Sequence, residues 1–137
     1  MHFEKYDSTK HYEILKDWYS NQSILTAMEI DLMNEEELSK WLDEPDRIHL
    51  IFFNEQLLPI GCVNFYHYKT QFPNYELGYL VDTKYQGQGL ATEMVRQSLE
   101  YAKSELQVKK IEEVYVIESN IGSKRVLEKN GFVFDRF

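Results

Sequence analysis

The segment from Gln86 to Ala91, with the sequence QGQGLA, is the part of the chain whose residue types are best suited to bind an anion. It follows an apolar run typical of a strand and precedes a helical pattern. Glycines permit a tight turn, and the unpaired N–H groups at the start of a helix lie at the positive end of its dipole. This combination predicts a binding site for a phosphate group.

The details of this loop disfavour two common nucleotide sites. A mononucleotide P-loop needs Lys-Ser or Lys-Thr after its second glycine, whereas Leu90 and Ala91 follow Gly89 here. A dinucleotide-binding loop carries a third glycine and follows the first strand of a repeated βαβ unit. From the loop alone, the alternative is that the two glycines only shape the connection between the strand and the helix.

Composition limits the classes of partner. The 137 residues suffice for one folded domain with one core, and 15 Lys and Arg against 23 Asp and Glu give a formal charge of −8. Such a charge repels nucleic acid and favours cationic small molecules or basic peptide ends. The first ten residues lack the apolar core of a signal peptide, and no window is long enough to span a membrane. We therefore expect neither a nucleic-acid nor a membrane partner.

The other reactive side chains receive no catalytic role. The single cysteine, Cys62, lies in an apolar run and has no second cysteine for a disulfide or a zinc site, so we expect a buried apolar residue, a cytoplasmic location and no metal. His67 lies between two tyrosines and is interpreted as a partly exposed strand residue.

Periodicity predicts an α+β fold that would position the loop. The predicted order begins with a strand at 2–6 and a helix that is capped by Ser8 or Thr9 and ends near 20–21. A second helix, with a capping box at Asn34 and Glu37, follows, and then a meander of three strands. The remaining elements are a long helix from Gly89, a strand, a short helix ended by Gly131, and a last strand. The predicted meander strands are 48–54, 58–69 and 75–81, and the later elements are 111–118, 120–130 and 132–137. The strands before and after the long helix can lie parallel, with a ligand at the loop.

Two motifs in this order resemble the GCN5-related N-acetyltransferase (GNAT) family. They are the loop after ELGYLV and the sequence NIGSKRVLEKNGF about thirty residues later, and the specific match covers residues 75–132. Within the family the chain looks most like the branch of ribosomal-protein-alanine N-acetyltransferases. The resemblance implies a single domain over residues 1–137, with splayed central parallel strands in a mixed sheet flanked by helices and a short C-terminal end.

The resemblance also implies that acetyl-CoA is the co-substrate. In the family the loop binds the CoA diphosphate through backbone amides, the splayed strand bonds the pantetheine arm, and side chains of the second motif approach the pantetheine, the thiol and the phosphates. The residues carried over are Tyr79, Leu80, Val81, Gln86, Gly87, Gln88, Gly89, Leu90, Ala91, Asn120, Ser123 and Lys124. Helix capping for Asn120 and Ser123, and a solvated charge for Lys124, are the structural alternatives.

Acetyl transfer to an amine needs a proton acceptor, donors to the developing oxyanion and a proton for the thiolate. Glu76 is our first candidate for the proton acceptor and Glu118 the second, and a solvent-facing carboxylate is the alternative for each. A strand N–H near Leu80 or Val81 is expected to stabilise the oxyanion. Many relatives carry a tyrosine in the second motif that is missing from Arg125-Val126-Leu127. Ser123 could supply the proton instead, with Tyr115 or solvent as alternatives.

The acceptor is expected to be a primary amine: a peptide or protein N-terminus, a polyamine or another small amine. Seven aromatic residues could line its cleft, although packing explains any single one better: Trp18, Tyr19, Tyr66, His67, Tyr68, Phe72 and Tyr75. A non-catalytic acyl-CoA-binding regulatory module is the alternative function, and a nucleotide-binding interaction module ranks last. Relatives usually continue beyond the second motif, so either the acceptor pocket is defective or a homodimer covers the last strand, and a monomeric mass by light scattering would exclude the dimer.

Overall fold

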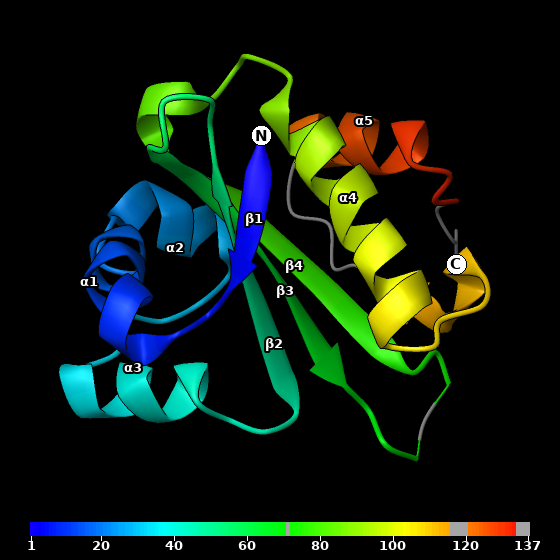
Figure 1. Cartoon of the computed structure of the whole chain (residues 1–137), viewed down its shortest axis with the longest axis horizontal. Helices are drawn as coiled ribbons and strands as arrows, with labels where there is room; N and C mark the ends of the chain where they lie inside the picture. Colours follow the sequence, from blue (N-terminus) through cyan, green and yellow to red (C-terminus); the bar gives the residue numbers. More distant parts are fainter. Residues whose placement is uncertain (71, 116–120, 134–137) are drawn as a thin grey trace.

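The computed structural model describes residues 1–70, 72–115 and 121–133, which fold into a mixed α/β arrangement (Figure 1). Within these residues one sheet has the strand order β1-β2-β3-β4-β5. The strands are β1 (His2–Lys5), β2 (Arg47–Phe53), β3 (Pro59–His67), β4 (Tyr75–Val81) and β5 (Val114–Tyr115). The helices are α1 (Ser8–Trp18), α2 (Gln22–Met28), α3 (Glu35–Leu42), α4 (Leu90–Glu105) and α5 (Ile121–Lys129).

The sheet is antiparallel from β1 to β4 and parallel between β4 and β5. This confirms the predicted meander and the predicted parallel pairing across the long helix. The described parallel pairing joins Tyr75 to Val114 and Glu76 to Tyr115. The predicted splaying beyond this point depends on residues 116–120, which lie outside the described residues.

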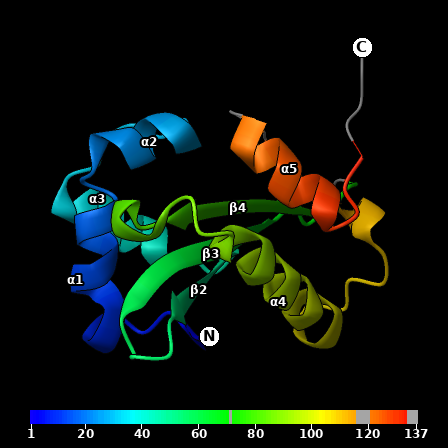
Figure 2. The same cartoon turned by 90° about the horizontal axis from the view of Figure 1, so that it is seen from above.

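Two apolar clusters cover the two faces of the sheet. Met94, Val95 and Ala102 of α4 pack on one face, as the predicted apolar stripe of this helix requires. Helices α1, α2 and α3 pack on the other face, against β-strand residues such as Ile51 and Leu80. In Figure 2, α2 and α5 are both drawn above β4, toward its two ends, and α4 is drawn below the sheet.

Local capping signals explain where the helices begin, with one correction and one omission. Asn34 and Glu37 form the predicted capping box. The first helix is capped by Asp7, not by Ser8 or Thr9, because the extended Asp7 carboxylate accepts from the Thr9 N–H at 2.9 Å. Sequence analysis missed α2: Asn21, expected near the end of the first helix, caps a new helix.

The C-terminal third departs most from the predicted elements. Residues Ile111–Glu113 form a 3₁₀ turn instead of the start of a strand, and the Glu113 N–H donates to the Lys110 carbonyl at 3.1 Å. The described residues of the predicted last strand, Phe132 and Val133, are not in a strand, and 134–137 lie outside the described residues. The predicted left-handed stop is confirmed, since Gly131 has a φ of 91° after α5.

Candidate functional site

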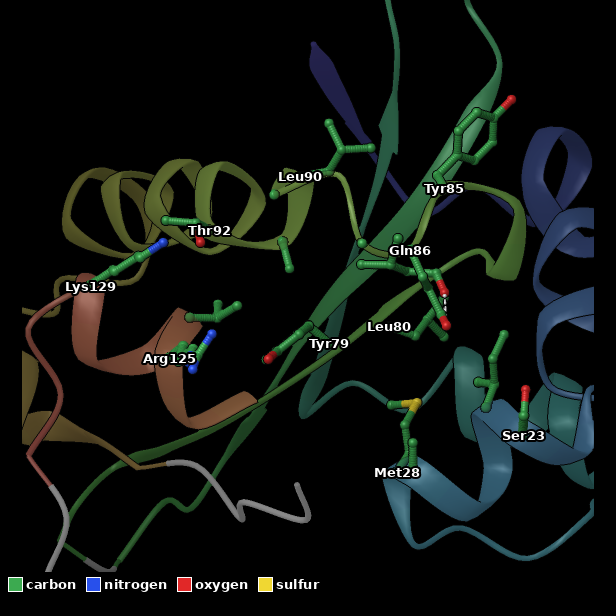
Figure 3. A pocket seen from close by; sticks show the side chains of 17 residues that line it. Ser23, Met28, Tyr79, Leu80, Tyr85, Gln86, Leu90, Thr92, Arg125 and Lys129 are labelled. Carbon is green, nitrogen blue, oxygen red and sulfur yellow. Dashed lines mark hydrogen bonds between the residues drawn. The ribbon is translucent and has the colours of Figure 1, made fainter. Parts of the chain in front are cut away.

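A pocket of about 540 Å³ lies where the glycine loop, the end of β4, α2, the start of α4 and α5 meet (Figure 3). Its walls come from segments that are far apart in the sequence. The lining residues are Ser23, Ile24, Ala27, Met28, Tyr79, Leu80, Val81, Tyr85, Gln86, Gly87, Gly89, Leu90, Ala91, Thr92, Arg125, Val126 and Lys129.

The glycine loop forms the anion-binding geometry that its sequence predicts. Gly87 and Gly89 have φ angles of 79° and 75°, in the left-handed region that glycine adopts without strain. Gly89 is the N-cap residue of α4 and has no side chain with which to accept from the first-turn N–H groups. These donors, at the positive end of a 16-residue helix, border the pocket and remain for a ligand.

Side chains hold this loop against the end of β4. Asp82 accepts from the Trp18 indole Nε1 at 2.9 Å and from the Lys84 N–H at 2.9 Å, which ties the loop to α1. The Gln86 Nε2 donates to the Val81 carbonyl at 3.0 Å. The side chain of Gln86 therefore fixes the loop on the strand, and its interaction with a ligand would use other groups.

The hydrogen-bond register of β4 determines which backbone groups face the pocket. The Asp82 N–H donates to the Ile60 carbonyl at 2.8 Å, and the ladder between β3 and β4 pairs Cys62 with Leu80. Because hydrogen-bonding direction alternates along a strand, the polar groups of Leu80 point toward β3 and those of Tyr79 and Val81 point away from it. Of the two predicted oxyanion donors, the Leu80 N–H points toward β3, so this candidate is wrong, whereas the Val81 N–H points away from β3, as does that of Tyr79. Leu80 lines the pocket with its side chain.

The structure brings eight of the predicted CoA-binding residues into this one pocket: Tyr79, Leu80, Val81, Gln86, Gly87, Gly89, Leu90 and Ala91. Gln88 and Lys124 are not among the residues that line it within the described chain. Ser123 lies in α5, but the placement of its side chain is outside the described part of the structure, as are Asn120 and Glu118.

Sequence analysis missed two walls of the pocket. One is the face of α2 formed by Ser23, Ile24, Ala27 and Met28, and the helix itself was not predicted. The other is the face of α5, with Arg125 and Lys129 one turn apart. The spacing of these two cations was available in the sequence, but only their position beside the loop gives it significance.

The charge of the pocket differs from that of the whole chain. Within the described residues its lining contains Arg125 and Lys129 and no carboxylate, although the chain has a net charge of −8. Glu93 lies in the first turn of α4, but Arg96 binds its carboxylate through two hydrogen bonds of 2.7 and 2.6 Å. These hydrogen bonds lower the pKa of Glu93 to about 2 and direct its charge to Arg96.

Glu76 lies on the face of β4 opposite the core that packs against α4, because it alternates along the strand with the buried Tyr75 and Leu77. The Tyr68 hydroxyl donates to Glu76 Oε2 at 2.8 Å. The Tyr68 ring stands edge-on to Tyr66 with centroids 4.7 Å apart, so packing orients the donor.

Several predicted cleft aromatics belong to the protein interior. Trp18 and Tyr19 are only 4% and 2% exposed and pack with α2 and α3, so they do not line an open cleft. His67 is a half-buried residue at the end of β3, as expected, and its ring stacks on that of Tyr75 with centroids 4.7 Å apart. Cys62 is fully buried, which confirms its interpretation as a buried apolar residue, and burial raises the pKa of its thiol to about 12.

Residues 1–70, 72–115 and 121–133 contain no helix that is long and apolar enough to cross a membrane. They also contain no group of three or more His, Cys, Asp or Glu side chains arranged to hold a metal ion.

Comparison with known proteins places this geometry in context. The sequence model of a family described as "Acetyltransferase (GNAT) domain" matches residues 2–133. A probable N-acetyltransferase of Bacillus subtilis, YjcK, is 46% identical over 56 residues, which are 41% of this chain and 30% of that protein. The aligned segment thus spans less than a third of the curated relative.

Solved structures share the fold at low sequence identity. A spermidine N-acetyltransferase from Vibrio cholerae, in complex with CoA and spermine, superposes with a TM-score of 0.84 at 16% identity, covering 98% of this chain and 81% of that one. The aminoglycoside acetyltransferase AAC(6')-Ib, in complex with CoA and kanamycin, gives a TM-score of 0.79 at 17% identity, covering 96% and 83%. At these identities the comparison shows a common fold.

Proposed function

Because the chain belongs to the GNAT acetyltransferase family, we propose that it is an acetyl-CoA-dependent N-acetyltransferase that acts on a primary amine. The observation that carries the proposal is the pocket of about 540 Å³ in which the glycine loop, the first turn of α4 and the side of β4 that faces away from β3 converge. The loop supplies N–H donors for a diphosphate, and the strand supplies backbone groups for the pantetheine amides.

In the proposed reaction the neutral amine attacks the thioester carbonyl carbon, and the carbon–sulfur bond breaks as the amide forms. The N–H of Val81 or Tyr79 donates to the carbonyl oxygen as it gains negative charge, because both groups point away from β3. Glu76 accepts the proton that the amine loses, directly or through water, and its hydrogen bond from Tyr68 orients the carboxylate. Ser123 is the proposed proton donor to the departing thiolate, and Glu118 is the second candidate for the proton acceptor.

The acceptor is proposed to be a polyamine or another small molecule with several amines, with a peptide or protein N-terminus as the other option. Two observations support this order. The net charge of −8 attracts polycations. The two structural neighbours were solved with spermine and with kanamycin, which each carry several amino groups. The predicted branch of ribosomal-protein-alanine acetyltransferases is not supported by these neighbours.

The test combines binding with turnover. Acetyl-CoA is titrated calorimetrically into the wild-type chain, Gly89→Trp and Gln88→Trp, each checked for folding by circular dichroism. Gly89 lines the pocket whereas Gln88 lies beside it in the same loop, so Gln88→Trp is a matched control for the added ring. We expect binding by the wild type and the control, and none by Gly89→Trp.

CoA release is then followed with a thiol reagent in the presence of spermidine, spermine, kanamycin and a peptide with a free N-terminus. Amine-dependent release supports the transferase. Acetyl-CoA binding without release in the full panel would instead favour the non-catalytic acyl-CoA-binding module, and a folded wild-type chain that binds no acetyl-CoA would refute both.

A further inference from the structure

Two cations on one face of α5 have no ion-pair partner in the described part of the chain. Arg125 and Lys129 are exposed, are separated by four residues and both line the pocket. Within the described residues neither forms an ion pair. Like charges at this spacing repel each other and destabilise a helix. The position of Lys129 in the last turn is favourable to the helix dipole, but this does not account for Arg125.

The fold fixes these cations beside the glycine loop. The Asn130 Nδ2, directly after α5, donates to the Thr92 carbonyl at 3.2 Å and to the Val126 carbonyl at 3.0 Å. Thr92 lies in the first turn of α4 and lines the same pocket. In Figure 3, Lys129 extends beside Thr92 and Arg125 stands on the preceding turn of α5. The pocket therefore has two separate groups of anion donors: the backbone N–H groups of the loop and the side-chain cations of α5.

A ligand that uses both groups must carry two separate anionic parts. Coenzyme A does so, because its diphosphate and the phosphate on its ribose 3′ position are separated by the sugar. We infer that Arg125 and Lys129 bind the 3′-phosphate of CoA and so make the pocket selective for CoA over dephospho-CoA. The inference deepens the proposed function and rests on it. A guanidinium can bind a phosphate through two parallel hydrogen bonds, and a lysine ammonium adds a mobile point charge.

The alternative is that the two cations serve the diphosphate, together with the loop. The two possibilities differ in a measurable way. If the cations bind the diphosphate, removing them weakens the binding of CoA and of dephospho-CoA equally. If they bind the 3′-phosphate, removing them weakens the binding of CoA alone.

The experiment is a calorimetric titration of CoA and of dephospho-CoA into three forms of the chain: wild type, Arg125→Gln/Lys129→Gln and Lys109→Gln/Lys110→Gln. The last variant removes the same charge from exposed positions that do not line the pocket, which controls for the change in net charge. Circular dichroism and thermal melting confirm that each variant is folded.

We expect the wild type and the control to bind CoA at least about tenfold more tightly than dephospho-CoA, which corresponds to about 1.4 kcal/mol. The pocket variant should bind both compounds with the affinity that the wild type has for dephospho-CoA. Equal wild-type affinities for the two compounds, or an equal loss for both in the pocket variant, would overturn the inference while leaving CoA binding intact. Binding of neither compound by the folded wild type would overturn the inference together with the proposed function.

Discussion

His49 should make the folded chain sensitive to mild acid. The side chain is 1% exposed, lies between the rings of Tyr6 and Trp41, and neither ring nitrogen makes a hydrogen bond of good geometry within the described residues. Burial, and to a lesser extent the charge of Arg47, lower the pKa of His49 from 6.5 to about 4. Between pH 6.5 and about pH 4, the His49 side chain therefore binds a proton in the unfolded chain but not in the folded chain.

The sign and the size of the effect follow from linkage. Well above pH 6.5, His49 is neutral in both the folded and the unfolded state, and the pH has no effect on stability through this group. As the pH falls from 6.5 toward 4, only the unfolded state gains the proton, so the free energy of unfolding decreases. With pKa values of 6.5 and about 4, the loss between pH 7.5 and pH 4.5 is about 2.5 kcal/mol. This window lies above the range in which carboxylates with lowered pKa values, such as Glu93, take up protons.

The assay is urea unfolding followed by circular dichroism at both pH values, on the wild type, His49→Leu and His2→Leu. Leucine has a similar volume and no proton to accept, and His2 is a control because its side chain is 46% exposed. Between pH 7.5 and pH 4.5 the free energy of unfolding should decrease by about 2.5 kcal/mol more for the wild type and the control than for His49→Leu. Equal losses for His49→Leu and the wild type, within about 0.5 kcal/mol, would refute the assignment, and His49→Phe repeats the test if the leucine variant does not fold.

Three further substitutions test particular contacts. Gly61→Ala should lower the free energy of unfolding by about 1–3 kcal/mol in a chemical denaturation series, because its Cβ would overlap the Leu80 carbonyl oxygen. An unchanged free energy of unfolding would contradict this packing. Gly89→Ala should lower it by only about 1–2 kcal/mol, the strain of a left-handed alanine, since its Cβ meets nothing within 4 Å. Tyr68→Phe should reduce kcat about tenfold and shift its pH profile with an unchanged KM for acetyl-CoA, because Glu76 loses its hydrogen bond; an unchanged profile argues against Glu76 as proton acceptor.

The features that could be predicted from the sequence are those that depend on neighbouring residues. The loop conformation follows from Gly87 and Gly89, the start of α3 follows from Asn34 and Glu37, and the stop after α5 follows from Gly131. Each combines a backbone or side-chain preference with a position a few residues away. Asn21 shows the limit of such signals, because the same residue type is suited both to a turn after one helix and to the cap of the next.

The features that could not be predicted depend on how distant segments meet. Whether Leu80 or Val81 presents its N–H to a ligand depends on the register with β3, and a shift of one residue would exchange them. The wall formed by α2 depends on how this helix packs on β4. Trp18 and Tyr19 were plausible cleft residues by type, and only the packing of three helices shows that they are interior.

The proposed reaction requires one protein to attract two ligands of opposite charge. A net charge of −8 draws an amine toward the chain but repels CoA, which carries three phosphate groups. The described structure separates the two requirements in space: the pocket contains backbone N–H donors and two cations without a carboxylate, while Glu76 lies on β4 before the strand enters the pocket. The net charge of −8 already includes these two cations, so they can neutralise the cofactor locally while the chain as a whole still attracts the amine. If this separation is correct, neutralising Arg125 and Lys129 should weaken CoA binding and leave the KM for a polyamine unchanged at saturating acetyl-CoA.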